Sequence, residues 1–250
     1  MSPPKSEIRT RSGLPHVEIR EAIPPEDVTA EKGFYFDSDV QARDFSADIP
    51  HYVSVICKLI ASLSPSSVLE FGCNAGRNLA VLKELLPAAA ISGVDLNPLA
   101  IEFGRRQWGL NLEVADETFL RRVNDNSYDV SFTISVLDHI PYVDTTIFDL
   151  IRVTRDYVIA YEICHKRSGK IIRMQSPEGE IVDGYPFSYF HDYRMKFEAM
   201  NCWNVMDVAL PAFRGNLGEF YRLQIFTKRH DLFGAQLVRG IDLIKFARQE

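Results

Sequence analysis

The sequence has few cysteines, little excess charge and no long apolar run. Its four cysteines, at positions 57, 73, 164 and 202, lack the paired spacing of a zinc site and are too sparse for a disulfide-rich fold. No apolar run approaches the roughly 18 residues of a membrane-spanning helix. The first residues, MSPPKSEIRTRSGLP, contain no apolar signal segment. We therefore expect a cytoplasmic protein with reduced thiols, no metal site and no membrane partner.

The balance of charge argues against nucleic acid as the main partner. The chain has 28 basic and 34 acidic residues, which gives a formal net charge of −6. Binding to a phosphate backbone depends on Lys and Arg, so this composition favours a small-molecule partner. The hydrophobic content, 46% of 250 residues, is ample for the core of a large domain.

Short apolar strands alternate with amphipathic helices through the middle of the chain. A helical stripe from Ile49 to Leu63 comes first, and Asn97 followed by Pro98 predicts a later helix start. This alternation indicates βαβ units, hence a parallel sheet with helices on both faces. The expected strands are VLEF (68–71), ISGVD (91–95), LNLEVA (110–115), YDVSFTI (128–134) and YVIAYEI (157–163).

The C-terminal third has a different pattern. KIIRMQ and EIVDGY flank SPEGE like an added hairpin or flap, and a helix is expected around 187–200. WNVMDVAL and EFYRLQIFTKR, joined by a short loop, predict an antiparallel pair. We therefore expect an N-terminal extension or lid (1–45), one domain (46–230) with an inserted segment (164–187), and a helical tail (231–250).

The stretch SVLEFGCNAGRNL, residues 67–79, is a glycine turn between a strand and a helix. A phosphate-binding loop needs Lys-Ser or Lys-Thr after its last glycine, but Arg-Asn follows Gly76. A dinucleotide fingerprint is disfavoured because Asn74 replaces a glycine and Glu70 would face pyrophosphate. S-adenosylmethionine carries no phosphate, and its sulfonium and ammonium suit a carboxylate. Asparagine also tolerates positive φ. We infer S-adenosylmethionine as the cofactor, with S-adenosylhomocysteine as the product.

Two further carboxylates follow the next strands. Asp95 ends the strand in GVDLNP, where a carboxylate can accept both ribose hydroxyls, although NAD-binding proteins use the same device. Asp116 either accepts from the adenine amino group or caps a helix. With Glu70, these side chains occupy the ends of three successive strands, a more specific pattern than any one of them.

These motifs together resemble the class I S-adenosylmethionine-dependent methyltransferases. VLEFGCNAG is similar to their first motif, GVDLNP to the second and YDVSFTISVLDHIP to the fourth, and the resemblance covers roughly residues 45–228. FGCNAGRNL, VLDHIP, RVTRDYVIAYEI and YFHDYRMKFE are similar to a bacterial subgroup, the pseudaminic acid biosynthesis-associated methylases, from which segment 164–187 departs. The resemblance implies an α/β, Rossmann-like class I methyltransferase sheet, mostly parallel, with a C-terminal antiparallel hairpin and helices on both faces.

The resemblance also implies a set of cofactor-binding residues at the ends of four strands. They are Glu70, Gly72, Asn74 and Gly76 at the methionine end, Asp95 and Leu96 at the ribose, Asp116 and Glu117 at the adenine, and Ser135 near the sulfonium.

Methyl transfer requires mainly alignment of the reactants and exclusion of water. A base is needed when the acceptor carries a proton of high pKa, as a sugar hydroxyl does. His139, after the fourth strand, is the candidate base, or else it shapes that loop. Structural roles are favoured for four further candidates: Glu162, His165, His191 and Asp192. A metal site built from Asp138, Asp144 and Glu162 is not favoured by their spacing.

We expect O-methylation of a small polar metabolite, most simply a sugar or sugar-derived intermediate. The [DN]PP[YF] and Pro-Cys motifs of nucleic-acid methylases are missing. The first alternative is N-methylation of a small molecule. The second is a non-catalytic S-adenosylmethionine-binding partner protein, which would have an altered first motif, and Asn74 in place of glycine is the one feature that favours it. The aromatic clusters at 34–36 and 185–193 either form a lid or pack against the sheet.

Overall fold

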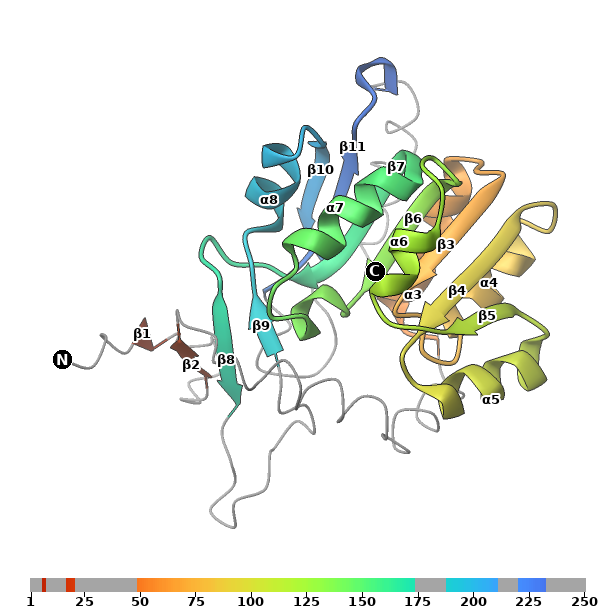
Figure 1. Cartoon of the computed structure of the whole chain (residues 1–250), viewed down its shortest axis with the longest axis horizontal. Helices are drawn as coiled ribbons and strands as arrows, with labels where there is room; N and C mark the ends of the chain where they lie inside the picture. Colours follow the sequence, from red (N-terminus) through yellow and green to blue (C-terminus); the bar gives the residue numbers. More distant parts are fainter. Residues whose placement is uncertain (1–5, 8–16, 21–48, 174–187, 211–219, 233–250) are drawn as a thin grey trace, which may run out of the picture.

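The computed structural model describes residues 6–7, 17–20, 49–173, 188–210 and 220–232 (Figure 1). Its main feature is a seven-stranded sheet. In spatial order the strands are β10 (Trp203–Ala209), β11 (Tyr221–Thr227), β7 (Thr154–Ile163), β6 (Tyr128–Ile134), β3 (Ser67–Phe71), β4 (Ala90–Asp95) and β5 (Asn111–Val114).

Five of these strands are parallel and two are not. Strands β7, β6, β3, β4 and β5 pair in parallel, whereas β11 pairs antiparallel with β7 and with β10. The predicted sheet, mostly parallel with a C-terminal antiparallel pair, is confirmed. Because parallel strands point the same way, the residues that follow β3, β4, β5 and β6 lie along one edge, which we call the carboxyl edge.

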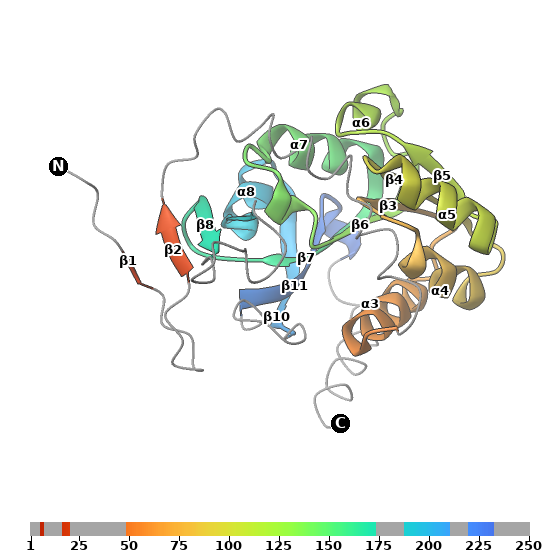
Figure 2. The same cartoon turned by 90° about the horizontal axis from the view of Figure 1, so that it is seen from below.

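Helices cover both faces of the sheet. Helices α6, α7 and α8 lie on one side and α3 and α4 on the other (Figure 2). Each side has its own buried apolar cluster. Among the described residues, no helix has the length and hydropathy to cross a membrane. The helices are α3 (His51–Ser62), α4 (Arg77–Leu85), α5 (Pro98–Trp108), α6 (Thr118–Arg122), α7 (Asp144–Val153) and α8 (Tyr193–Ala199), with 3-10 turns η1 (Leu137–His139) and η3 (His230–Leu232).

Local sequence explains where α5 starts and ends. The Asn97 side chain accepts from the backbone N–H groups of Leu99 at 3.0 Å and Ala100 at 3.1 Å, and Pro98 takes the first helical position. The helix ends at Gly109, whose φ of +58° is left-handed. The predicted cap is therefore confirmed, and it holds the start of α5 beside the end of β4.

A second, small sheet includes β8, which holds the first part of the predicted added hairpin. Its strands are ordered β1 (Ser6–Glu7), β2 (Val17–Arg20), β8 (Gly169–Arg173) and β9 (Ser188–Phe190), all antiparallel. Strand β9 packs beside η1. The segment EIVDGY, the aromatic residues 34–36, and the extension and tail apart from the described strands and η3 lie outside the described residues.

The prediction of a helix from about 187 was wrong at its start. Residues 188–190 form β9, and α8 begins at Tyr193. Asp192 explains the boundary, because its side chain accepts from the backbone N–H of Met195 at 3.0 Å and so caps the helix.

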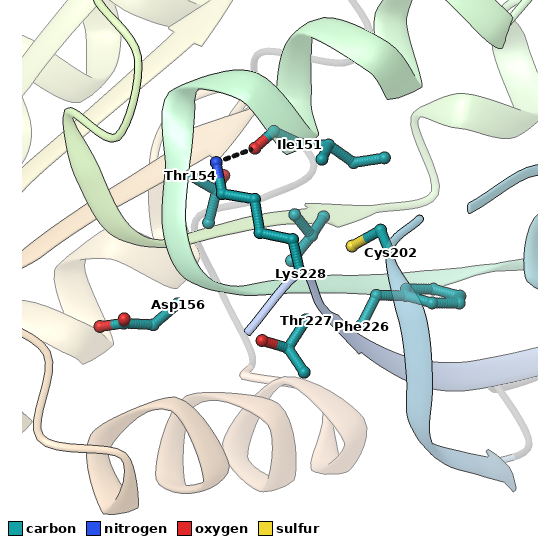
Figure 3. A pocket seen from close by; sticks show the side chains of 8 residues that line it. Ile151, Thr154, Asp156, Cys202, Phe226, Thr227 and Lys228 are labelled. Atoms are coloured by element: carbon teal, nitrogen blue, oxygen red, sulfur yellow. Dashed lines mark hydrogen bonds between the residues drawn. The ribbon is translucent and has the colours of Figure 1, made fainter. Parts of the chain in front are cut away.

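A small hollow lies beside the start of β7, at the edge of the sheet opposite the carboxyl edge (Figure 3). Lys228, just after β11, reaches across it, and its Nζ donates to the Ile151 carbonyl at 3.0 Å in the last turn of α7. Burial lowers the pKa of Lys228. A cation at a helix C-terminus satisfies the free carbonyl groups there, so the Lys228 side chain stabilises α7. The hollow lies away from the carboxyl edge, so we assign it no part in the candidate site.

Candidate functional site

The glycine turn after β3 has three residues in the left-handed conformation. Their φ values are +76° for Gly72, +49° for Asn74 and +80° for Gly76. A Cβ on Gly72 would clash with the Val136 side chain. The Asn74 Oδ1 accepts from the backbone N–H of Ala75 at 2.6 Å, which supports asparagine in this unusual conformation. The substitution of Asn for Gly therefore preserves the tight turn.

Asp95 ties this turn to the next strand. Its Oδ2 accepts from the backbone N–H of Asn74 at 2.7 Å, and its Oδ1 accepts from that of Asn97 at 2.8 Å. Burial raises the pKa of the Asp95 carboxyl, although these backbone donors oppose the rise. Each carboxylate oxygen has a second lone pair, so the side chain can accept further hydrogen bonds from a ligand. Leu96 follows it, partly exposed at the same edge.

Glu70 is a buried carboxyl with one unsatisfied oxygen. Its exposed fraction is 1%, and its Oε1 accepts from Asn78 Nδ2 at 2.5 Å. Its Oε2 has no hydrogen-bond partner among the described residues. Burial raises the pKa of Glu70 to about 8, and the bond from Asn78 partly opposes the rise. A buried acceptor without a partner is costly, and a cationic ligand at the turn would satisfy it.

Asp116 acts locally as a cap. Its Oδ1 accepts from both the backbone N–H and the hydroxyl of Thr118, at 3.0 and 2.5 Å, at the start of α6. The Oδ1 atom of Asp116 therefore makes the capping hydrogen bonds that the sequence offered as one interpretation. The loop also joins β4, because the Ala115 N–H donates to the Asp95 carbonyl at 2.9 Å. Asp116 and the neighbouring Glu117 are partly exposed at the carboxyl edge.

Ser135 follows β6 in a left-handed conformation, with φ of +53°. Its hydroxyl lies 2.7 Å from the Tyr221 hydroxyl and donates to the Asp138 carboxylate at 3.3 to 3.4 Å. His139 is mostly buried, with 14% of its side chain exposed, and its Nε2 lies 3.7 Å from Asp138 Oδ1. The structure thus brings Ser135 and His139 together around a fully buried carboxylate.

The other titratable candidates hold the surrounding loops. Glu162 is fully buried and accepts from the backbone N–H groups of Val136, at 3.1 Å, and Asp138, at 3.3 Å. His191 lies 3.2 Å from both the Ile140 carbonyl and the Ser168 hydroxyl, and burial lowers its pKa to about 4. A neutral His191 therefore joins the small sheet to the loop after η1.

The remaining candidates lie apart from this cluster. Burial lowers the pKa of His165, whose ring packs edge-on against Phe190. The three acids considered for a metal do not gather, because Asp144 is exposed and pairs with Lys196 at 2.8 Å. In the part of the chain that the structure describes, no three potential metal ligands come together.

Tyr221 is the residue at this site that sequence reasoning missed. It is 86 positions from Ser135 and begins β11, opposite Ile163 of β7. Its ring packs on that of Tyr161 at 5.1 Å, and Tyr161 stacks on Tyr52 at 5.0 Å. The sequence carried one usable signal, the predicted antiparallel strand whose first residues must lie near the carboxyl edge.

Comparison with known proteins agrees with this geometry. Residues 69–165, from β3 to just past β7, match a family model described as a methyltransferase domain. The chain carries a methyltransferase domain. The prediction of a methyltransferase is therefore confirmed. A search of curated proteins finds no match to the sequence.

Solved structures share the fold of this methyltransferase at low identity. One is the 1,6-didemethyltoxoflavin-N1-methyltransferase of Burkholderia thailandensis, with bound 1,6-didemethyltoxoflavin and S-adenosylhomocysteine. It is 16% identical with a TM-score of 0.62, over 84% of this chain and 95% of that one. The plantazolicin methyltransferase BpumL, also with S-adenosylhomocysteine, is 16% identical with a TM-score of 0.53, over 82% and 100%. An O-methyltransferase family protein from B. thailandensis is 11% identical with a TM-score of 0.51, over 70% and 55%. The predicted cofactor agrees with the product bound in the first two.

Proposed function

We propose that this domain transfers a methyl group from S-adenosylmethionine to a small polar metabolite, by O-methylation of a sugar or sugar-derived intermediate. The observation that carries the cofactor assignment is the unsatisfied, buried Oε2 of Glu70 beside the glycine turn, where a Cβ on Gly72 would clash with the Val136 side chain. A cationic, phosphate-free ligand fits that oxygen, whereas a pyrophosphate does not. When bound, S-adenosylmethionine supplies a methyl group on a positively charged sulfur.

The chain's residues would then bind, orient and dehydrate the reactants. We assign Glu70 and the turn residues Gly72, Asn74 and Gly76 to the methionine end. Asp95, which keeps free lone pairs, would take the ribose, with Leu96 beside it. Asp116 and Glu117 would lie at the adenine, and Ser135 near the sulfonium. These roles rest on the resemblance and on the common edge at which the side chains lie.

Binding a cation beside Glu70 should release a proton. The carboxyl keeps its proton in the folded protein between its ordinary pKa of 4.5 and about 8. The unfolded chain loses that proton at the lower pH, so the associated stability is present below 4.5 and is lost as pH rises through about 8. A cation at Oε2 lowers the pKa of Glu70, so we expect release of about one proton on binding at pH 7 and almost none at pH 9.

Calorimetric titration with S-adenosylmethionine in two buffers of different ionisation enthalpy measures that proton. Glu70→Gln is the matched variant, because it keeps the shape and the bond from Asn78 but cannot ionise, and it corrects for protons lost by the ligand. Identical proton release in Glu70→Gln and the parent protein at pH 7 would exclude Glu70 from the cation site.

His139 is the proposed base for a hydroxyl acceptor. His139→Ala should slow turnover at least about tenfold, because a positioned base contributes that much or more, and should leave cofactor affinity within about twofold. Normal turnover in this variant would return His139 to a role in shaping the loop.

The acceptor is tested by transfer of a labelled methyl group to a panel of free sugars, nucleotide sugars and small amines. Label on a sugar oxygen supports the proposal, and membership of the pseudaminic acid-associated subgroup would predict a nonulosonic acid or its precursor. Label on amines alone would favour the N-methyltransferase alternative, which the toxoflavin N1-methyltransferase fold also accommodates. Binding of cofactor with no transfer to any acceptor would favour the non-catalytic partner.

We propose a cytoplasmic enzyme with no nucleic-acid or membrane partner. We also propose the division into extension or lid, domain with inserted segment, and tail.

A further inference from the structure

The loop after β6 leaves the sheet at Ser135. The N–H of Ser135 donates to the Tyr161 carbonyl at 2.9 Å, which extends the pairing of β6 with β7 by one residue. Ser135 then has φ of +53°, a left-handed conformation that ends the extended path of the strand. The N–H groups that follow therefore need acceptors other than the β7 backbone, because buried donors without a partner are costly.

The side chain of the next residue in β7 supplies such an acceptor. Glu162 follows Tyr161 and is fully buried. Its Oε2 accepts from the backbone N–H groups of Val136 at 3.1 Å and Asp138 at 3.3 Å, and its Oε1 lies 3.3 Å from the same Val136 nitrogen. One carboxyl group of β7 thus continues the hold on the loop that the Tyr161 carbonyl begins.

The 3-10 turn η1 forms directly on these contacts. The N–H groups of His139 and Ile140 donate to the carbonyls of Val136 at 2.9 Å and Leu137 at 3.2 Å. The first N–H groups of such a turn have no preceding carbonyl within it. Because Glu162 accepts from the N–H groups at this beginning, it fixes the turn that carries His139.

The hold of Glu162 on the loop does not depend on its charge. Burial raises the pKa of Glu162 well above its ordinary value. A carboxyl group keeps one oxygen with two free lone pairs whether or not the other oxygen carries a proton, and that oxygen can accept from both N–H groups. An uncharged side chain with an oxygen at the same place should therefore replace Glu162, whereas an apolar side chain should not.

The same loop packs against the glycine turn. A Cβ on Gly72 would lie 2.9 Å from Val136 Cβ and would clash with both methyl groups of Val136. Gly72 in turn donates its N–H to the Val94 carbonyl of β4 at 2.8 Å. Val136, whose backbone Glu162 holds, is therefore the contact between the loop of His139 and the turn to which we assign the cofactor.

We propose that Glu162 is a positioning residue, which sets the place of residues 135–139 relative to the glycine turn and so aligns the groups on the acceptor side with the cofactor. This inference rests on the proposed function. Glu162 acts through Val136 and His139 rather than by contact with the reacting atoms. The rate of an in-line displacement depends steeply on alignment, and a misplacement of about 1 Å can lower it about 100-fold.

Glu162→Leu removes the acceptor and keeps a similar volume. The N–H groups of Val136 and Asp138 must then move to find other partners. With the panel acceptor that is methylated fastest, we expect kcat to fall at least about tenfold. Affinity for S-adenosylhomocysteine, measured by calorimetry, should stay within about threefold, because Glu70 and Asp95 keep their contacts.

Two further substitutions of Glu162 separate position from charge. Glu162→Gln keeps an oxygen for the two N–H groups and should hold kcat within about threefold of the parent protein. Glu162→Asp keeps the carboxyl but shortens its reach by one CH₂ group, so it should lower kcat at least about fivefold. Equal kcat values in Glu162→Asp and the parent protein, or a loss in Glu162→Gln as large as in Glu162→Leu, would overturn the proposal.

Thr154→Val is the matched control, because it removes a buried hydrogen-bonding group at the other end of β7. The Thr154 hydroxyl lies 2.6 Å from the Leu150 carbonyl and 2.7 Å from the Ser131 hydroxyl. This variant should lower the Tm and leave kcat unchanged at temperatures below its unfolding. A fall in kcat as large as that of Glu162→Leu would assign both effects to general loss of stability and overturn the proposal.

A second measurement needs neither cofactor nor acceptor. In protein with ¹³C-labelled valine methyl groups, the Val136 resonances are identified by their loss in Val136→Ala. We expect Glu162→Leu and Glu162→Asp to shift these resonances in the ligand-free protein and Thr154→Val to leave them in place. Unshifted Val136 resonances in the Glu162 variants would show that Glu162 does not position the loop, whatever reaction the enzyme catalyses.

Discussion

Gly104→Ala is expected to destabilise the protein by about 2–3 kcal/mol and to abolish cofactor binding. Gly104 lies in α5, where an added Cβ would overlap the carbonyl oxygen of Ala75 in the glycine turn. It would also come within 2.7 Å of Leu112 Cδ1 and 2.9 Å of the Ala75 carbonyl carbon. Backbone atoms have no rotamer to change, so either the helix or the turn must move. Both movements disturb the edge at which we place the cofactor.

Urea unfolding and calorimetric titration with S-adenosylhomocysteine measure the two effects. Alanine favours an isolated helix over glycine by about 1 kcal/mol, so any loss of stability must come from the contact. Gln107→Ala, at an exposed position of the same helix, is the matched control and should leave both quantities unchanged. A Gly104→Ala protein as stable as the parent would contradict the close approach of α5 to the turn.

Asp95→Ala is expected to weaken binding of S-adenosylhomocysteine at least about 100-fold. The substitution removes the acceptor of the Asn74 and Asn97 N–H groups as well as the proposed ribose contacts. Hydrogen bonds to a charged group contribute roughly 1.5–3 kcal/mol each, and about 1.4 kcal/mol corresponds to a tenfold change in affinity. The loss of the two proposed ribose hydrogen bonds alone therefore accounts for the expected fall in affinity.

Asp95→Asn makes the same test more selective. The known partners of Asp95, which include the N–H groups of Asn74 and Asn97, are all backbone donors. An amide can therefore accept from some of them, but it turns its own NH₂ group toward another. We expect this variant to lose most of the affinity despite its nearly unchanged shape. Asp125→Ala, which removes an exposed partner of Arg152, is the control. Unchanged affinity in Asp95→Asn, measured by calorimetry, would remove Asp95 from the binding site.

Local signals predicted the scaffold of the site because they act over a few residues. The alternation of apolar strands and amphipathic helices predicted the parallel sheet, and the Asn97–Pro98 pair predicted the start of α5. Asn74 was expected to keep the tight turn, and its φ of +49° bears this out. Each of these features depends on backbone geometry that a short sequence determines.

The inner part of the site could not be predicted, because it depends on pairing between distant strands. Tyr221 meets Ser135 only because β11 lies antiparallel beside β7. The burial of Asp138 and Glu162 depends likewise on how η1 folds back over the end of β7. The helix that was wrongly predicted to start at about 187 could have been placed correctly from local sequence. Asp192 is a strong helix-capping residue, and the aromatic residues before it favour a strand.

The central claim is that the carboxyl edge of this sheet binds S-adenosylmethionine. Calorimetric titration of the purified protein with S-adenosylmethionine and S-adenosylhomocysteine, with NAD as the control ligand, tests it most directly. We predict micromolar binding of both adenosyl ligands and no binding of NAD, because a cationic ligand stabilises the ionised carboxylate of Glu70, whereas the pyrophosphate of NAD does not. Binding of NAD without either adenosyl ligand, or binding of none of the three, would contradict the cofactor assignment and the methyl-transfer function proposed from it.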